Sequence, residues 1–394
     1  MRIAHIITRL IVGGAQENTL LCCRDLRAHH GHDVRLWTGP QQGPEGSLLA
    51  QARDSGVALT VVPSLRRAVH PWSDVRAYWQ LRRALRDFRP HVVHTHSAKA
   101  GVLGRLAASR LRVPAIVHTV HGSPFHPYQS ALARGLFRAC ERWAARHCHQ
   151  LVSVADAMTD LLVQEGVAPR EKFITIYSGM DVDAFLNCGP LRDGMRAELG
   201  YGPQHVVIGK VARLFHLKGH DDVIQAARGV VARCPPARFL FVGDGVRRGD
   251  LQRQIARAGL SGHVQFTGLL PPEQMPALMA ALDIVVHASL REGLARVLPQ
   301  ALIAGRPVVS YDVDGAREVV LPDETGLLVP PRAVGPLADA LVQLVEDAQL
   351  RQRLGAAGRA RFAEQFRHER MSDQLAQLYE RLLSHHPTGA RARV

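Results

Sequence analysis

The sequence predicts an α/β protein with two Rossmann-like domains, each built on a doubly wound parallel sheet. Short β-branched stretches alternate with helical stretches along the whole chain, which favours parallel strands joined by right-handed crossovers. The alternation falls into two series, separated by a stretch rich in Gly, Pro and Asp. A chain of 394 residues is also too long for one ordinary core, so two domains are expected.

The first series predicts an N-terminal sheet and the helices that connect its strands. Strands are expected at 3–7, 34–37, 58–62, 92–94, 115–118, 151–154 and 173–176. Helices between them are expected to include 15–29, 73–88, 98–110 and 129–147.

The second series repeats this pattern. Strands are expected at 206–211, 238–242, 264–267, 284–287 and 307–310. Helices are expected to include 219–233, 247–258, 296–304 and 334–347.

The stretch 181–202 interrupts the alternation and is expected to link the domains. We therefore expect one domain over 1–185 and a second over 186–370. Apolar residues at helical spacing predict a further helix over 371–385. The polar, basic tail 386–394 is expected to be disordered.

The composition is that of a folded protein, with 46% hydrophobic and 21% charged residues. No apolar run approaches the ~18 to 20 residues that span a bilayer. The start of the chain is too short for the apolar core of a secretion signal and is expected to be the first strand. The six cysteines form no CxxC pair, so buried thiols in a reducing, cytoplasmic compartment are expected.

The net charge of +14 lies mostly in the N-terminal half. It fits an Arg-rich solvated surface, and equally an attraction to an anionic membrane face or a phosphorylated acceptor. The stretch 73–88 combines Trp, Tyr and Leu with Arg, as membrane-surface helices do. A crossover helix that faces the core has the same pattern and is the preferred interpretation. No basic–aromatic motif indicates a nucleic-acid partner.

The segment 289–301 carries the strongest sign of chemistry. It places Glu292 between an expected strand and an expected helix, where open α/β sheets bind ligands. The N–H groups of Gly293, Leu294 and Ala295 are expected to be unpaired donors of the first helical turn, suited to phosphate or hydroxyl oxygens. Gln300 lies two helical turns beyond Glu292, so both can face one cleft.

Two cations follow the first strand of the second series. Arg213 and Lys218 flank a loop that ends at a helix start, which is typical of an anion clamp. Surface charge on a loop is the alternative interpretation.

Glycines follow several strands, at Gly13-Gly14, Gly243 and Gly268 with Leu269. Such glycines let a ligand approach the backbone, although ordinary turns between a strand and a helix use glycine too.

Histidines end two strands of the first series, in His94-Thr95-His96 and in the stretch that contains His118 and His121. A His-x-His pair on a strand can bind a metal. No Cys or carboxylate stands nearby to complete such a site, so hydrogen bonds to hydroxyls or phosphate are preferred and no metal is expected.

Taken in order, these motifs resemble the GT-B glycosyltransferases of family 4 over nearly the whole chain. The match includes Ser178-Gly179-Met180-Asp181, with Ser178 in place of the family's usual Asn. The stretches 94–104 and 118–125 look like those of bacterial enzymes that extend lipid-linked glycans. The resemblance implies two domains facing a cleft, with residues 1–185 binding the acceptor, residues 186–370 binding the nucleotide sugar, and the last helix packing back on the N-terminal domain.

The resemblance also implies a role for each matching residue. Arg213 and Lys218 would hold the diphosphate and offset charge on the leaving group, while Glu292 would bind donor hydroxyls. His121 would contact the hexose. The remaining donor contacts would come from Gly14, Gly243, Gly268, Leu269, Gly293, Leu294, Ala295 and Gln300. Gln300 replaces the Glu that usually binds the ribose. His94, His96 and Lys99 would bind the acceptor.

The implied activity is a retaining, metal-independent transfer of a hexose or N-acetylhexosamine from a UDP-sugar. The implied acceptor is a glycan or lipid diphosphate of cell-envelope polysaccharide synthesis, met at the inner face of the cytoplasmic membrane. No cofactor is implied beyond the nucleotide sugar. A small soluble acceptor and a non-catalytic nucleotide-sugar binder are the alternatives.

Overall fold

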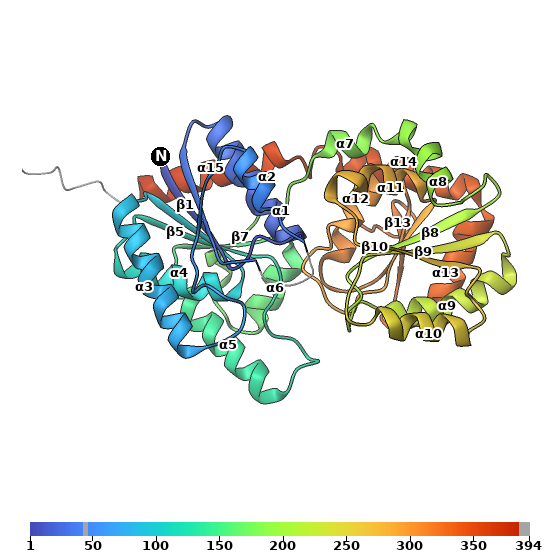
Figure 1. The fold of residues 1–394 in the computed structure, drawn as a ribbon, viewed down its shortest axis with the longest axis horizontal. Coiled ribbons are helices and arrows are strands. Elements are labelled where there is room, and N and C mark those ends of the chain that lie inside the picture. The colour runs from blue at the N-terminus through green and yellow to red at the C-terminus, as the bar shows by residue number, and fades with distance from the viewer. Residues whose placement is uncertain (42–45, 386–394) are drawn as a thin grey trace, which may run out of the picture. The chain divides into compact units, whose positions relative to one another are not determined.

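The computed structural model describes residues 1–41 and 46–385 and divides them into two compact units (Figure 1). The first unit holds Met1–Met180 together with residues from Arg367 onward, and the second holds Asp181–Phe366. The tail 386–394, expected to be disordered, lies outside the described residues.

The first unit is built on a parallel sheet of seven strands in the order β3-β2-β1-β4-β5-β6-β7. The strands are β1 (Arg2–Ile7), β2 (Asp33–Thr38), β3 (Ala58–Val61), β4 (Val92–His96), β5 (Ala115–Val120), β6 (Gln150–Ser153) and β7 (Phe173–Thr175). The helices are α1 (Gly14–Ala28), α2 (Leu49–Asp54), α3 (Pro71–Phe88), α4 (Ala98–Arg110), α5 (Ala131–Ala145), α6 (Asp156–Gln164), a 3-10 turn (Arg170–Lys172) and α15 (His368–Ser384).

The second unit is built on a parallel sheet of six strands in the order β10-β9-β8-β11-β12-β13. The strands are β8 (Val206–Val211), β9 (Ala237–Val242), β10 (Val264–Gly268), β11 (Ile284–His287), β12 (Val308–Tyr311) and β13 (Gly326–Val329). The α-helices are α7 (Val182–Leu186), α8 (Arg192–Glu198), α9 (His220–Arg233), α10 (Arg248–Arg257), α11 (Met275–Ala281), α12 (Val297–Ile303), α13 (Val334–Glu346) and α14 (Ala348–Phe362). Short 3-10 turns lie at Gly189–Leu191, Pro272–Gln274 and Asp314–Glu318.

The strand orders confirm the doubly wound α/β class in both units. In each sheet the chain first winds outward to one side and then crosses back to wind toward the other. The direction changes between β1 and β4 in the first unit and between β8 and β11 in the second. Ligands bind open α/β sheets at the carboxyl ends of such neighbouring strands. The loops that follow these four strands are therefore the expected ligand-binding loops.

Helix α15 belongs to the first unit, although it is the last element of the chain. It packs on α1 and on the first sheet through Met371, Leu375 and Tyr379. His368, at its first turn, lies 2.6 Å through Nδ1 from a carboxylate oxygen of the buried Asp25 of α1. This packing agrees with the expectation that the last helix folds back on the N-terminal domain.

The chain leaves and re-enters the first unit at one place. Met180 and Arg367 form a parallel bridge, and the His368 N–H donates to the Met180 carbonyl over 3.2 Å. A Cβ on Gly179 would lie 2.5 Å from the His368 Cα, which explains a glycine there. The units therefore divide after residues 180 and 366, where the expectation was 185 and 370.

Strand β13 and the helices α7, α8, α11 and α14 of the second unit were not among the predicted elements. Strand β13 begins with Gly326, and a glycine weakens the signal of a strand this short. Helix α14 contains Gly355 and Gly358, where a Cβ would lie 2.1 Å from the Gly305 carbonyl oxygen and 2.7 Å from a Leu302 methyl. These glycines let α14 approach α12 closely. They also lower the helix propensity of the segment, so the sequence did not predict this helix.

Candidate active site

The second unit brings Lys218 and Glu292 together at the change of winding direction. Lys218 closes the loop after β8, and Glu292 lies in the loop after β11, so the pairing of these strands brings both loops to one edge of the sheet. The Lys218 ammonium donates to Glu292 Oε1, and both side chains are mostly buried, 19% and 23% exposed. The structure thus joins a cation and a carboxylate that lie 74 residues apart in sequence.

Glu292 is held as a carboxylate. Burial alone would raise its pKa, but the charge of Lys218, the neighbouring His287 and hydrogen bonds outweigh it and lower the pKa to about 2. His287 Nε2 lies 3.8 Å from Glu292 Oε1. The Glu292 backbone N–H donates to Asp314 Oδ2 over 2.6 Å, which fixes the loop itself. At neutral pH this site therefore presents a fixed negative acceptor of hydrogen bonds.

Arg213 does not join this ion pair. It is exposed on the loop after β8, and its guanidinium carbon lies 5.1 Å from the centre of the Phe215 ring. The two cations expected to clamp an anion therefore have different partners in the ligand-free chain: Phe215 for Arg213 and Glu292 for Lys218.

The glycine turns after β9 and β10 lie side by side. The Gly243 N–H donates to the Gly268 carbonyl over 2.9 Å, and the φ angles of these residues, +130° and +75°, favour glycine. Beside them Arg248 pairs with Asp244 at 2.9 Å, and the neighbouring Leu269 is 46% exposed. The turns thus present the exposed apolar side chain of Leu269, which is suited to a flat ring.

The segment after Glu292 differs from the expectation. Helix α12 begins at Val297, so Gly293, Leu294 and Ala295 lie in a loop and not in a first helical turn. The loop is held instead by the Gly315 N–H, which donates to the Gly293 carbonyl over 3.1 Å. Gln300 is a half-buried residue of α12. Glu292 lies outside this helix, so the two residues are not separated by two helical turns.

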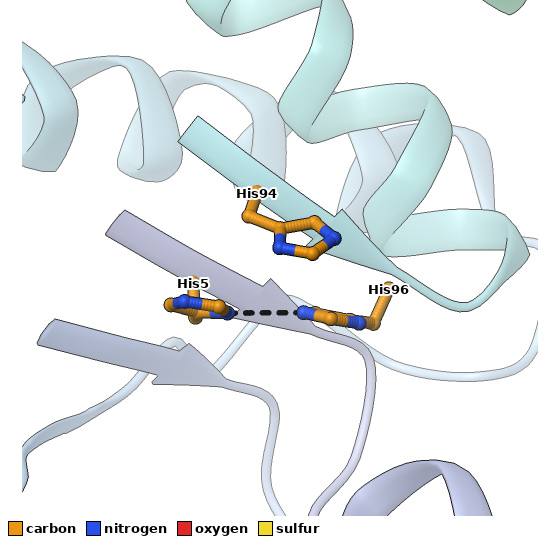
Figure 2. A group of neighbouring side chains, drawn as sticks. All are labelled: His5, His94 and His96. Carbon is orange, nitrogen blue, oxygen red and sulfur yellow. Dashed lines mark hydrogen bonds between the residues drawn. The ribbon is translucent and has the colours of Figure 1, made fainter. Parts of the chain in front are cut away.

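The first unit places a row of histidines on its two central strands, β1 and β4 (Figure 2). His5 Nδ1 lies 3.0 Å from His96 Nε2, and His96 Nδ1 lies 3.1 Å from His121 Nε2. His94 is bonded on both sides, at 2.5 Å to the Tyr379 hydroxyl and at 2.7 Å to Thr119 Oγ1. Three of these side chains, His5, His94 and His96, are no more than 1% exposed.

Two of the expected acceptor contacts are buried. His94 is enclosed by the sheet and by Tyr379 of α15, and His96 is 1% exposed between His5 and His121. Lys99 is bonded to Asp74 Oδ1 at 2.6 Å and to the Ala68 carbonyl, with 12% of its side chain exposed. His121 is half-buried, and Gly14 is exposed at the start of α1, so these two remain reachable.

The His5, His94 and His96 nitrogens come within 4.8 Å of one another, which is a spacing that a metal ion could use. In this arrangement both nitrogens of His94 and both of His96 lie at hydrogen-bond distance from other groups. Burial lowers the pKa of all three rings, so they are neutral. The cluster fits a hydrogen-bonded network better than a set of ligands aimed at one point.

Sequence reasoning did not identify Lys210, His287 or Asp314 as members of the site. Asp314 gives no signal, because it reaches Glu292 only through the fold. Lys210 does give a signal in the sequence, since lysine is rarely found inside an apolar strand such as β8.

Two family matches cover most of the chain. Residues 13–179 match the glycosyl transferase 4-like domain, and residues 192–361 match the glycosyl transferases group 1. The chain is 31% identical over 292 residues to the 2-deoxystreptamine glucosyltransferase of Streptomyces kanamyceticus, covering 71% of this chain and 74% of that protein. The chain belongs to the group 1 glycosyl transferases. It is therefore a glycosyltransferase that uses a nucleotide sugar.

Two further comparisons place this glycosyltransferase among bacterial enzymes. It is 26% identical over 356 residues to the Escherichia coli UDP-Gal:alpha-D-GlcNAc-diphosphoundecaprenol alpha-1,3-galactosyltransferase, with 89% of each chain covered. The structure of Anabaena HepE, solved with UDP and glucose, superposes with a TM-score of 0.82 at 22% identity, covering 96% of this chain and 99% of that one. The latter likeness confirms the fold of the glycosyltransferase, with its two Rossmann-like domains.

Proposed function

We propose that this glycosyltransferase moves a hexose or N-acetylhexosamine from a UDP-sugar to a lipid-linked glycan, with retention of anomeric configuration and without a metal ion. The observation that carries the proposal is the Lys218–Glu292 pair at the winding change of the second sheet. A carboxylate that binds sugar hydroxyls and a cation that binds diphosphate are there already in contact.

The donor would displace this contact. Lys218 and Arg213 would turn to the diphosphate and stabilise the charge that grows on the leaving group, a role that a metal ion fills in other transferases. Glu292 would accept hydrogen bonds from hexose hydroxyls, and Gln300 would meet the ribose. The turns at Gly243 and Gly268 with Leu269 would hold the base, and the loop at 293–295 the sugar and phosphates.

Two residues of the first unit would keep the roles that the family resemblance implies. His121 would contact the hexose, and Gly14, exposed at the start of α1, would let the backbone approach the diphosphate. The leaving phosphate would take the acceptor proton, so no protein nucleophile is needed. A trapped covalent glycosyl-enzyme, or a product of inverted configuration by NMR, would contradict this mechanism.

The lipid-linked acceptor is supported by the E. coli relative, whose name gives a diphosphoundecaprenol acceptor. Among the described residues no helix is long and apolar enough to cross a bilayer, so such an acceptor would be met at a membrane surface.

Helices α3 and α5 offer a surface for that meeting. On α3 the apolar side chains of Trp72, Val75 and Trp79 are 78%, 53% and 56% exposed, while the opposite face packs into the core. Helix α5 exposes Leu132 and Leu136, at 85% and 60%. Exposed arginines lie beside both rows, at Arg76, Arg83, Arg86, Arg138, Arg142 and Arg146. Apolar rows flanked by cations fit an anionic lipid surface.

Flotation with vesicles tests the membrane contact. The chain should bind phosphatidylglycerol vesicles and leave phosphatidylcholine vesicles unbound. The double variant Trp72→Ser with Trp79→Ser should lose most of this binding, while Leu191→Ser, at an apolar residue of the second unit that is 49% exposed, should not. Equal binding by all three proteins would contradict the assignment of this surface.

A small soluble acceptor is the second candidate, favoured by the S. kanamyceticus relative, which is named for 2-deoxystreptamine. A panel of UDP-, GDP- and ADP-sugars, offered with GlcNAc-diphosphoundecaprenol or with 2-deoxystreptamine and analysed by mass spectrometry, separates the candidates. Transfer from a UDP-sugar to the lipid diphosphate alone supports the proposal. Transfer only to the soluble acceptor, or only from another nucleotide, contradicts it.

A further inference from the structure

Lys210 is a buried lysine without a hydrogen-bond partner. It lies in β8, where it pairs with Phe241 of β9, and it is 0% exposed. Its ammonium nitrogen has no hydrogen-bond acceptor among the described residues. Burial of an unpaired ammonium is costly, so a lysine kept in this place needs a reason that the ligand-free fold does not supply.

The charges around Lys210 are those of the donor site. Lys218 and Glu292 face it from the loops after β8 and β11, and Asp222 faces it from α9. Burial and the charge of Lys218 lower the pKa of Lys210, Glu292 and Asp222 oppose the change, and the result is about 7. His220 and His287, from α9 and β11, stay neutral because burial lowers their pKa values to about 2 and about 3.

Both nearby carboxylates already have partners. Glu292 is paired with Lys218, and Asp222 accepts a hydrogen bond from the Tyr311 hydroxyl at 2.8 Å. In the ligand-free chain Lys210 therefore has no unmatched negative charge beside it. Binding of a diphosphate would change this balance, because it adds negative charge and draws Lys218 away from Glu292.

We propose that Lys210 is a third cation of the donor site, a positioning residue that takes up a proton from solvent when a nucleoside diphosphate sugar binds. The inference rests on the proposed function. Once protonated, Lys210 stabilises Glu292 from the protein side while Lys218 serves the diphosphate. The buried amine is thus only partly protonated in the free chain and becomes protonated when the anion binds.

Proton uptake makes donor affinity depend on pH. Since Lys210 is more protonated in the complex than in the free chain, affinity should be highest below about pH 7. Above that value it should fall by up to about tenfold per pH unit, until the pKa of the complex is reached. UDP-glucose is the suitable probe, because its diphosphate carries no proton that titrates in this range.

Calorimetry in two buffers of different ionisation enthalpy at pH 8 measures the protons bound. We expect close to one proton taken up per UDP-glucose by the wild type and none by Lys210→Met. Lys172→Met, which removes a lysine of the first unit, should behave as the wild type. Lys210→Gln, which keeps a polar side chain, should also take up none and replaces the Met variant if that one does not fold.

Thermal unfolding separates this role from a structural one. Lys210→Met removes a buried unpaired amine, so Tm without ligand should stay or rise, while the rise in Tm caused by UDP-glucose should shrink. If Lys210 served only in packing, Lys210→Met would lower the Tm measured without ligand. No proton uptake by the wild type, or uptake that persists in both variants, would overturn the proposal. Absence of binding by every UDP-sugar tried would instead contradict the proposed function, and this inference with it.

Discussion

Lys218 and Glu292 form an ion pair at the carboxyl ends of two neighbouring strands, β8 and β11. In the ligand-free chain each side chain neutralises the charge of the other. A nucleotide sugar would need both groups, the cation for its diphosphate and the carboxylate for its hydroxyls. The pair holds both charges at the site until a donor displaces the contact between them.

The stability that is lost when the pair is broken should depend on pH in a defined way. The folded-state pKa of Glu292, about 2, lies below its ordinary 4.5, so the ionised group stabilises the fold above about pH 4.5. That stabilisation is lost as the pH falls toward 2. Lys218→Met leaves the carboxylate without its cation and should lower the free energy of unfolding of the second unit at pH 7 by roughly 1 to 3 kcal/mol.

Thermal unfolding at a series of pH values checks this expectation. The difference between wild type and Lys218→Met should be largest near pH 7 and should shrink between pH 4.5 and 2. Arg317→Met, which removes the exposed partner of Asp312, is the control and should change little. A difference that does not vary with pH would contradict the role of the ion pair.

The turn at Gly243 should not tolerate a side chain. Its φ is +130°, and a Cβ would lie 2.4 Å from the Ala212 carbonyl oxygen. Gly243→Ala should therefore cost about 1 to 3 kcal/mol of stability and weaken donor binding, because the turn moves. Gly249→Ala, in α10, where the nearest atom would be 3.7 Å away, should be neutral or stabilising. Urea unfolding and donor titration of both variants measure the contrast.

Gln300 should contribute a neutral hydrogen bond to the donor. Gln300→Ala should weaken donor binding about two- to tenfold, the value of one or two neutral hydrogen bonds. Gln300→Glu should tighten it, because a carboxylate forms stronger bonds to ribose hydroxyls. If titration calorimetry finds that Gln300→Ala binds the donor as the wild type does, the ribose role is wrong.

Tyr379 should tie α15 to the first sheet through His94. Its hydroxyl lies 2.5 Å from His94 Nδ1, and both side chains are 0% exposed. Tyr379→Phe leaves that nitrogen buried without its partner and should cost roughly 1 to 3 kcal/mol. Tyr78→Phe, at a half-buried position of α3, is the matched control. Equal unfolding midpoints for the two variants in urea would show that the contact adds nothing.

Much of the fold could be predicted from the sequence, because each parallel strand is a short apolar run and each crossover helix has its own period. The strand ends that carry the site were also foreseeable, since glycines and charged residues follow those strands in the sequence. The loop conformation of Gly293–Ala295 was not, because the Gly293 carbonyl is held by Gly315 from the loop after β12, and no local signal marks that contact.

The site was predicted less completely than the fold. Glu292 and Lys218 stand at strand ends, where position alone indicates a role, but their pairing depends on β8 lying next to β11. The burial of His94 and His96 could not be predicted, because alternation along β4 cannot tell a buried face from an open one when both faces are covered. Lys210 was visible in the sequence but has meaning only beside Lys218 and Glu292.

The most direct test of the account is the rate of sugar transfer by Glu292→Gln. Transfer from UDP-sugars to GlcNAc-diphosphoundecaprenol would be followed by mass spectrometry for the wild type and the variant. We expect one added hexose or N-acetylhexosamine with the wild type, and a rate at least about a hundredfold lower with Glu292→Gln, because the fixed charge is lost. A variant that transfers at the wild-type rate would contradict the assignment of Glu292 as the anchor of the donor sugar.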